Sequence, residues 1–338
     1  MRTRAGIVGF RGYSGMELVK ILAAHPRVEP VLMEHRTDAA PETHPLGWQG
    51  PERIAATAEA ARGAGVAAVL LATPADVSMQ LAPEFLDAGM RVIDLSGAFR
   101  LRTAERYRHW YKEEHTKPAL LEEAVYGLPE FYREQVKGAR LVANPGCYPT
   151  AANLALRPLV EAGLIDRAHG VVCDAKSGVS GAGRKPSLKT SFCEVTENFS
   201  AYSILGHRHV PEVLLNSGLE EHEFSFTAHL LPIHRGILET IYFRAAEAAT
   251  EERLLEAYQS AYGEEPFVKL YPPGAVPDLR PVQHTNLCLI GFRLDDATRR
   301  AVVVACIDNL GKGAAGQAVQ NLNLMLGFPE AEGLSCAQ

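Results

Sequence analysis

The first third of the chain alternates short apolar runs with segments of helical spacing. Between residues 14 and 25, Met16, Val19 and Leu22 recur every three to four residues, which predicts an amphipathic helix that Pro26 ends. Residues 66–73 are almost continuously apolar, as in a strand buried in a parallel sheet. The expected strands are residues 5–10, 28–33, 66–73 and 90–96, and the expected helices are residues 14–25 and 76–88. This order predicts an α/β fold with a doubly wound parallel sheet.

The pattern changes after residue 147, where strand-like runs become longer and fewer helices separate them. This texture predicts a second, α+β domain with a mixed or antiparallel sheet. Residues 177–187 form a Gly-, Ser- and Lys-rich loop, and residues 36–51, rich in Pro, His and Gly, form a surface loop. The expected strands here are residues 169–177, 224–231, 237–244, 286–294 and 300–308, with a last helix at 317–326.

Composition narrows the class of protein. The chain has 338 residues, of which 47% are hydrophobic and 22% charged, and its formal net charge is −6, so nothing in the charge favours a nucleic-acid partner. No apolar run approaches the roughly 18 residues of a membrane helix. The six cysteines form no C-x-x-C pair, which predicts neither a zinc site nor disulfides. We therefore expect a soluble cytoplasmic protein without a bound metal.

The motif NPGCYPT at residues 144–150 carries the candidate nucleophile. A short apolar strand precedes it, and a helix-like segment follows from Thr150. This context places Cys147 near a helix N-terminus, where backbone N–H groups favour the thiolate and can hold a developing oxyanion. The alternative interpretation is a buried structural cysteine, which is the commoner role of this residue type.

A glycine-rich turn, GFRGYSG at residues 9–15, follows the first expected strand and opens the first helix. Glycines there permit a tight turn and let a pyrophosphate approach the helix N-terminus. The alternative is a turn without a ligand. After the second expected strand, Glu34 could bind a ribose 2′-hydroxyl, as in NAD sites, while Arg36 could bind the 2′-phosphate of NADP. These residues leave the choice between the two dinucleotides open.

The motif GHRHVPE at residues 206–212 supplies a candidate acid–base pair, His207 and His209. Histidine exchanges protons near neutral pH, and a Cys–His couple is the usual arrangement for an activated thiol. A zinc half-site or a hydrogen-bonded loop histidine is the alternative. Cationic residues near these motifs predict a pocket for an anionic substrate, although each one alone is more often a surface charge. They are Lys176, Arg184, Lys185, Arg208, His234, Arg235 and Lys312.

Taken together, the motifs resemble the N-acetyl-γ-glutamyl-phosphate reductase family along nearly the whole chain. They are GYSG at 12–15, IDLS at 93–96, FR at 99–100, YGLPE at 126–130, NPGCYPT at 144–150, KSGVSGAGR at 176–184, GHRH at 206–209, LPIHRG at 231–236 and DNLGKGAAG at 308–316. The chain departs from the family pattern at Phe10-Arg11, at Glu34-His35 and at Gly97-Ala98.

The resemblance implies a Rossmann-type domain over residues 1–147, completed by 309–338, and a catalytic and oligomerisation domain over 148–308 that is similar to glyceraldehyde-3-phosphate dehydrogenase. It also implies a homodimer or homotetramer, the cofactor NADP(H), and contacts to both ligands. The implied cofactor contacts are Gly9, Arg11, Gly12, Tyr13, Ser14, Gly15, Arg36, Ser96, Ser177, Gly178 and Asn309. The implied substrate contacts are Asn144, Lys176, Arg184, Arg208 and Arg235.

The implied activity is reduction of an acyl phosphate to an aldehyde in arginine biosynthesis. Cys147 would form a thioester, and one histidine, by preference His209, would move the proton. Aspartate-semialdehyde dehydrogenase shares this logic but not the GHRH or LPIHRG motifs. A carrier-linked aminoadipyl-phosphate reductase typically lacks the KSGVSG pattern. A dinucleotide-binding redox sensor usually adds a DNA-binding helix pair and a basic face, and the sequence indicates neither. The glycine-rich opening turn argues against a thiol hydrolase.

Overall fold

The computed structural model describes residues 2–35 and 50–336 and divides the chain into two compact units. The first unit comprises Met1–Thr103, His115–Asn144 and Ala318–Gly333. The second comprises Ala104–Glu114, Pro145–Gln317 and Leu334–Gln338. These limits differ from the domain limits expected from the sequence. Cys147 and residues 309–317 belong to the second unit, because the helix that starts at Cys147 and the turn after residue 308 pack on its sheet.

The first unit is built on a seven-stranded sheet in the order β3-β2-β1-β4-β5-β7-β6, and all its strand pairs are parallel. This confirms the doubly wound parallel sheet. The order reverses direction between β1 and β4, where such folds bind dinucleotides. The strands are β1 (Thr3–Val8), β2 (Val28–Glu34), β3 (Arg53–Ala55), β4 (Val66–Leu71), β5 (Arg91–Asp94), β6 (Val125–Tyr126) and β7 (Leu141–Ala143). Its helices are α1 (Tyr13–Ala23), α2 (Ala58–Gly63), α3 (Ala75–Asp87), α5 (Pro118–Glu123) and α6 (Pro129–Gly138).

Most expected elements of this unit occur within a few residues of their predicted limits. The first strand ends at Val8 instead of Phe10, because Gly9 adopts a φ of +82° and starts the turn. Hydrophobic spacing did not reveal β3 and β6, which have three and two residues, since so short a run has no readable period. The expected surface loop at 36–51 lies almost entirely outside the described residues.

The second unit contains a mixed seven-stranded sheet in the order β12-β13-β14-β11-β8-β10-β9. Its neighbours are antiparallel except for β8 with β10 and β12 with β13. This confirms the predicted α+β character. The strands are β8 (Val171–Gly178), β9 (Ser200–Tyr202), β10 (Phe224–Leu231), β11 (Ile237–Arg244), β12 (Val268–Leu270), β13 (Cys288–Asp295) and β14 (Arg300–Ile307). The helices are α4 (Ala104–Tyr111), α7 (Cys147–Glu161), α8 (Phe192–Val195), α9 (Val210–Ser217) and α10 (Glu251–Tyr262).

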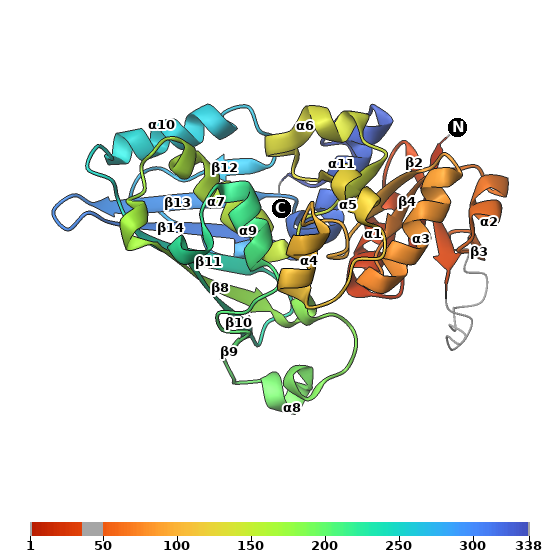
Figure 1. The fold of residues 1–338 in the computed structure, drawn as a ribbon, viewed down its shortest axis with the longest axis horizontal. Coiled ribbons are helices and arrows are strands. Elements are labelled where there is room, and N and C mark those ends of the chain that lie inside the picture. The colour runs from red at the N-terminus through yellow and green to blue at the C-terminus, as the bar shows by residue number, and fades with distance from the viewer. Residues whose placement is uncertain (1, 36–49, 337–338) are drawn as a thin grey trace. The chain divides into compact units, whose positions relative to one another are not determined.

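One face of this sheet forms the core of the second unit. Along β10 buried and half-buried residues alternate, and Phe226 and Ala228 share the buried face with their β8 partners Cys173 and Ala175. Helix α7 packs on β11 and β14, and Figure 1 shows α7, α9 and α10 over the sheet. After β14, a π-helical turn at Gly311–Ala315 leads into α11 (Gly316–Leu326). Helix α7 also packs against this π-helical turn.

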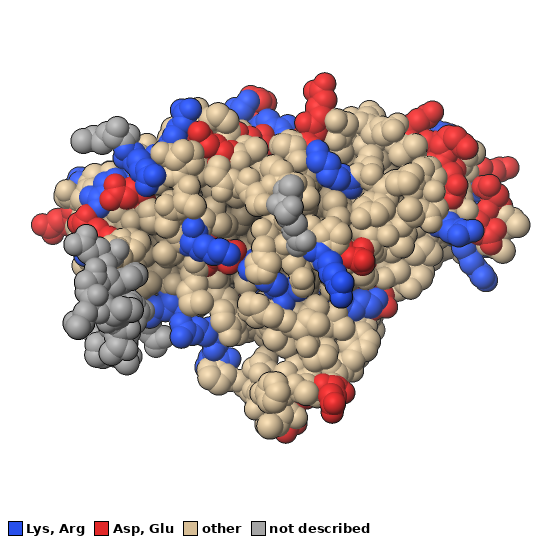
Figure 2. Space-filling model, turned by 180° about the vertical axis from the view of Figure 1, so that it is seen from behind, with Lys and Arg blue, Asp and Glu red and all other residues tan. Residues whose placement is uncertain are grey.

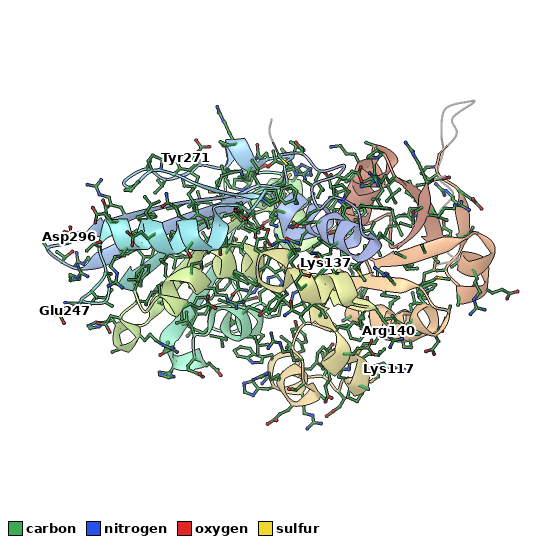
Figure 3. All side chains as sticks on the ribbon, turned by 90° about the horizontal axis from the view of Figure 1, so that it is seen from above. Lys117, Lys137, Arg140, Glu247, Tyr271 and Asp296 are labelled. Carbon is green, nitrogen blue, oxygen red and sulfur yellow. The ribbon has the colours of Figure 1, made fainter. Side chains whose placement is uncertain are left out.

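The surface carries interspersed charges. Both basic and acidic side chains occur on the face in Figure 2, among larger areas of other residues. Lys137 and Arg140 extend outward in Figure 3 and pair with Glu134 at 2.7 Å and Glu123 at 2.8 Å. Such exposed pairs contribute little to stability. Over residues 2–35 and 50–336, no helix combines the length and apolar content needed to cross a membrane.

Candidate active site

Cys147 is the first residue of α7, so the helix begins three residues earlier than the sequence predicted. Gly146 precedes it as the N-cap in an extended conformation, without a side-chain cap. The amide and hydroxyl of Thr150 both bond the Gly146 carbonyl oxygen at 3.0 Å, which fixes the first turn. The thiol therefore lies where helical N–H groups point toward an incoming anion.

Burial distinguishes Cys147 from the other cysteines. The thiols of Cys173 and Cys306 are buried, and burial raises the pKa of each, which keeps them protonated. Cys288 is also buried, while Cys193 and Cys336 are exposed and lie outside the first turn of a long helix. Cys147 alone among the six is half-buried at the start of a long helix. This environment is typical of a reactive thiol.

Both candidate histidines lie beside the residue that follows Cys147. The ring of Tyr148 is 5.4 Å from that of His207 and 6.0 Å from that of His209, centroid to centroid, and the two imidazoles are 4.9 Å apart. His207 and His209 are 6% and 7% exposed. His209 is the N-cap residue of α9. The second unit thus brings together the cysteine and histidine motifs, which are about sixty residues apart in sequence.

The two histidines have different hydrogen-bond environments. The backbone N–H of His209 donates to Nδ1 of His207 over 3.1 Å, so Nδ1 is an acceptor and the ring proton of neutral His207 is on Nε2. Burial, with a smaller effect of the Arg208 cation, lowers the pKa of His207 to about 4. His207 is therefore a neutral donor at pH 7 and a poor proton acceptor there.

Glu212 connects the two motifs, a role that the sequence did not reveal. It lies in the first turn of α9 and is 0% exposed, and its Oε2 accepts the Gly146 N–H at 2.9 Å. The backbone carbonyl oxygen of Glu212 accepts a hydrogen bond from the side-chain amide of Asn216 at 2.7 Å. The carboxylate thereby ties the histidine helix to the residue before Cys147. Its position three residues after His209 was the only available signal.

The turn after β14 presses against Cys147. A Cβ on Gly313 would lie 2.9 Å from the Cβ of Cys147, so only glycine fits there. The neighbouring Lys312 is 0% exposed, and its Nζ is 5.4 Å from the Phe267 ring centroid. The packing explains why small residues dominate this π-helical segment, a type of distortion common at functional sites.

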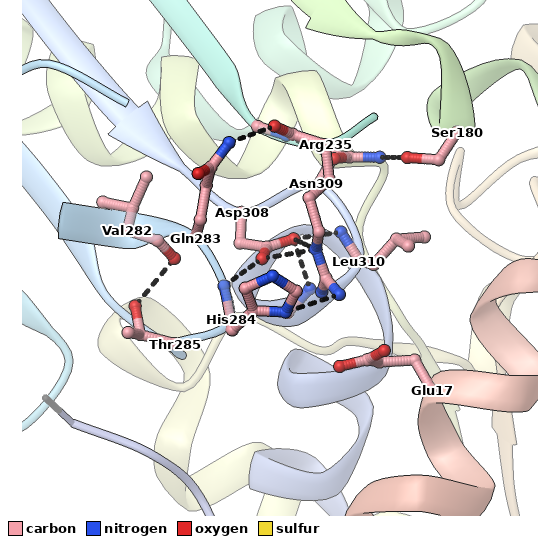
Figure 4. Close-up of polar contacts among 12 residues, drawn as sticks. Glu17, Ser180, Arg235, Val282, Gln283, His284, Thr285, Asp308, Asn309 and Leu310 are labelled. Carbon is pink, nitrogen blue, oxygen red and sulfur yellow. Dashed lines mark hydrogen bonds and ion pairs between the residues drawn. The ribbon is translucent and has the colours of Figure 1, made fainter. Parts of the chain in front are cut away.

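Arg235, a predicted substrate contact, takes part in a buried network (Figure 4). Its Nε pairs with Asp308 at 2.7 Å, and one terminal nitrogen lies 3.0 Å from Nδ1 of His284. Asp308 is 0% exposed and also accepts the backbone N–H groups of residues 284, 310 and 311. Asn309, a predicted cofactor contact, accepts the Gly236 N–H at 2.7 Å and donates to Ser180 at 3.0 Å. In the structure these groups hold the loops together.

The other cations predicted to contact substrate differ in their surroundings. The Nζ of Lys176 donates to the Asp174 carboxylate at 2.6 Å, on the opposite face of β8 from Ser177. Arg184 and Arg208 are exposed in the second unit, and Arg208 is near enough to lower the pKa of His207. Among the three cations Lys176, Arg184 and Arg208, Arg208 is therefore the one that the structure places near the histidines.

Gly178, a predicted cofactor contact, packs so tightly that a Cβ would lie 2.8 Å from the Arg235 backbone nitrogen.

In the first unit, two glycines of the predicted dinucleotide turn lie where no side chain fits. A Cβ on Gly9 would lie 2.2 Å from the Ala72 carbonyl oxygen, and one on Gly15 would lie 2.2 Å from that of Gly9. Gly12 is the N-cap of α1 and makes no side-chain cap, so the backbone at Tyr13 and Ser14 begins the helix directly. The turn therefore fits a dinucleotide at the N-terminus of α1.

Three other predicted contacts concern this unit. Ser96 donates to the buried carboxylate of Asp94 at 2.7 Å, and burial raises the pKa of that carboxyl group. Asn144 is 1% exposed, and its side-chain oxygen accepts from Asn321 at 3.0 Å. Arg36 lies outside the described residues. Among the described residues, no group of three or more His, Cys, Asp or Glu side chains could hold a metal ion.

Comparison with known proteins identifies the family. A family model described as "Semialdehyde dehydrogenase, NAD binding domain" matches residues 4–139, and "Semialdehyde dehydrogenase, dimerisation domain" matches residues 147–309. The chain is 47% identical over 341 residues to an N-acetyl-gamma-glutamyl-phosphate reductase of Symbiobacterium thermophilum, covering 99% of this chain and 98% of the relative. The chain belongs to the N-acetyl-gamma-glutamyl-phosphate reductase family. This confirms the resemblance drawn from its motifs.

Further comparisons agree with this family. A reductase of Desulforudis audaxviator is 46% identical over 338 residues, covering 98% of this chain and 97% of the relative. The solved structure of aspartate semialdehyde dehydrogenase II from Vibrio cholerae has a TM-score of 0.71, covers 97% of this chain and 99% of its own, and is 18% identical. That likeness shows the shared fold alone. Members of the reductase family are oxidoreductases, and the first unit of this chain is a nicotinamide-dinucleotide-binding domain.

Proposed function

We propose that this chain reduces N-acetyl-γ-glutamyl phosphate to N-acetylglutamate 5-semialdehyde and phosphate, a step of arginine biosynthesis. The observation that carries this proposal is the half-buried Cys147 at the start of α7, whose neighbour Tyr148 packs against two buried histidines, in a chain of this family. The name of the relatives supplies the substrate class. The aspartate-semialdehyde alternative has only a likeness of fold in its favour.

Cys147 supplies the covalent step. Its thiolate attacks the γ-carbonyl carbon, the carbon–oxygen bond to phosphate breaks, and phosphate leaves with the bonding electrons, so that a thioester remains. A bound nicotinamide dinucleotide supplies the hydride that reduces the thioester. The N–H groups at the start of α7 stabilise the oxyanion that develops on the carbonyl oxygen. Collapse of the thiohemiacetal breaks the carbon–sulfur bond and regenerates the thiolate.

We assign the proton transfer to His209. The carbonyl oxygen gains a proton as the thiohemiacetal forms and loses it on collapse, so the residue must both donate and accept near neutral pH. The low pKa of His207 and its Nδ1 bond to the His209 backbone support a positioning role for His207. Arg208, exposed beside this pair, is the proposed contact for substrate anions.

For the cofactor we propose NADP(H), held by the glycine turn between β1 and α1. We also propose a cytoplasmic location, because the six cysteines, all among the described residues, form no disulfide bond. The reverse reaction tests the activity directly. With N-acetylglutamate semialdehyde and NADP, dinucleotide reduction measured by absorbance is expected to require added phosphate. Equal rates without phosphate would indicate simple aldehyde oxidation, and activity with aspartate semialdehyde alone would favour the alternative enzyme.

We further propose that the chain forms a homodimer or homotetramer through its second unit, which matches a dimerisation domain. The segment between β8 and α9 exposes large apolar side chains, whose cover by a second copy would remove them from water. They are Leu188, Phe192, Phe199, Ile204 and Leu205. Changing Phe192 and Leu205 together to serine is expected to lower the mass measured by sedimentation toward the 36.7 kDa of one chain. A parent protein that sediments as a monomer would contradict the proposal.

A further inference from the structure

A charged cluster in the first unit lies beside the glycine turn. Arg11, within that turn, donates from both terminal nitrogens to the carboxylate of Glu34, over 2.5 Å and 2.8 Å. Arg53, at the start of β3, approaches the same carboxylate at 3.6 Å. The pair thus joins the glycine turn to the last residue of β2, 23 residues later in the sequence.

Phe10 holds the two arginines in place. Its ring is 6% exposed, and the guanidinium carbons of Arg11 and Arg53 lie 4.6 Å and 5.5 Å from its centroid. Cations at these distances from an aromatic ring are attracted to it. The cluster therefore presents two cations fixed by one buried ring and one carboxylate.

The cluster occupies the edge of the sheet where an adenosine ribose binds in such folds. Glu34 is the last residue of β2, and the glycine turn follows β1, its parallel neighbour. The carboxyl ends of both strands meet at that edge. The side chains of Arg11, Glu34 and Arg53 are 30%, 28% and 33% exposed, so a ligand can reach them.

An acidic residue at the end of the second strand commonly binds the ribose 2′-hydroxyl of NAD. Here, however, both oxygens of Glu34 already accept from Arg11, and the cluster of two cations and one carboxylate carries a net charge of +1. Arginine forks match a phosphate well. We infer that Arg11 and Arg53 bind the 2′-phosphate of the adenosine ribose and that Glu34 positions Arg11, an inference that rests on the proposed dinucleotide cofactor.

The test measures binding of two fragments, 2′,5′-ADP and 5′-ADP, by isothermal titration calorimetry. Arg53→Ala is expected to weaken 2′,5′-ADP about tenfold and 5′-ADP less than about twofold, because only the former has the 2′-phosphate. Arg11→Ala is expected to weaken 2′,5′-ADP more, about thirtyfold, since Glu34 would then repel the phosphate without its partner. Glu34→Gln keeps an acceptor for Arg11 and removes the negative charge, so it should bind 2′,5′-ADP at least as tightly as the parent.

Arg27→Ala is the matched control, because Arg27 in the same unit also pairs with a carboxylate, Glu332 at 3.0 Å, and lies 5.5 Å from a phenylalanine ring. It should leave both affinities unchanged. Equal losses of the two fragments in Arg11→Ala and Arg53→Ala would overturn the inference. So would a Glu34→Gln variant that loses 5′-ADP affinity, which would make Glu34 a ribose ligand. Neither fragment carries a nicotinamide ring or takes part in the reaction at Cys147. The binding results are therefore independent of whether the chain has reductase activity.

Discussion

Replacing Cys147 by serine is expected to lower kcat/KM for the phosphate-dependent oxidation of N-acetylglutamate semialdehyde by about 10³-fold or more. Serine keeps the size of the side chain but is scarcely ionised at neutral pH, whereas a thiol at a helix N-terminus supplies thiolate. The rate is followed as dinucleotide reduction. A second readout is alkylation by iodoacetamide, which should label residue 147 in the parent and abolish its activity.

Cys336→Ser is the matched control, because Cys336 is exposed and the same atom is exchanged. Its kcat/KM should equal that of the parent. Circular dichroism and the melting temperature should show that both variants fold. A Cys147→Ser protein with near-normal turnover would remove the thioester from the mechanism, whatever the control shows.

Replacing His209 by alanine is expected to lower kcat about 10²- to 10⁴-fold and to remove one limb of the pH–rate profile. Replacing His207 by alanine should cost about tenfold, since it removes only the acceptor for the His209 backbone N–H, and should leave that limb in place. The pH limb is expected to survive in the His207→Ala variant because of the environment of His207. Burial lowers its pKa to about 4, so it is already deprotonated across the neutral range and contributes no change of rate there.

His222→Ala provides the control, because His222 is exposed in the same unit. The pH–rate profiles of the three variants should be recorded with saturating dinucleotide. If His209→Ala retained the limb and His207→Ala lost it, the assignment would be reversed. If both variants retained the limb, the proton would pass through another group.

The lowered pKa of His207 also makes a contribution to stability that depends on pH. An unfolded chain takes up a proton on this residue at higher pH than the folded chain does, so protonation favours unfolding as the pH falls from about 6.5 toward 4. This contribution is absent above that range. Urea melts of the His207→Ala variant should therefore show a weaker loss of stability in mild acid than those of the parent.

Local sequence determined much of the fold. The spacing of Met16, Val19 and Leu22 identified the first helix but not its buried face, since its buried residues are Gly15, Leu18 and Leu22 and Met16 is 45% exposed. The apolar run at 66–73 identified a central strand, because that pattern arises from neighbours along the chain. The change of texture after residue 147 likewise predicted the mixed sheet. The sequence did not predict the strands β3 and β6, of three and two residues. Strands this short are defined by the strands they pair with and not by a hydrophobic period of their own.

The candidate site could be predicted from the sequence only in part. The sequence motifs predicted Cys147, the histidine pair and the glycine turn as site residues. Each motif combines a chemically reactive residue, or a conformationally free glycine, with a recognisable local context. The same reasoning took Arg235 as a ligand for substrate. Its carboxylate partner, Asp308, is 73 residues away and was invisible to local patterns.

The sequence by itself determined the two sheet types and the family, and it supplied the prediction that Cys147 is the nucleophile. Only the tertiary structure decided that His207 is a neutral donor, that Glu212 ties α9 to Gly146, and that Arg11 pairs with Glu34. The physical reason is that periodicity and turn chemistry depend on residues close in sequence. Protonation, burial and ion pairing depend instead on which distant groups the packed chain brings within a few ångströms.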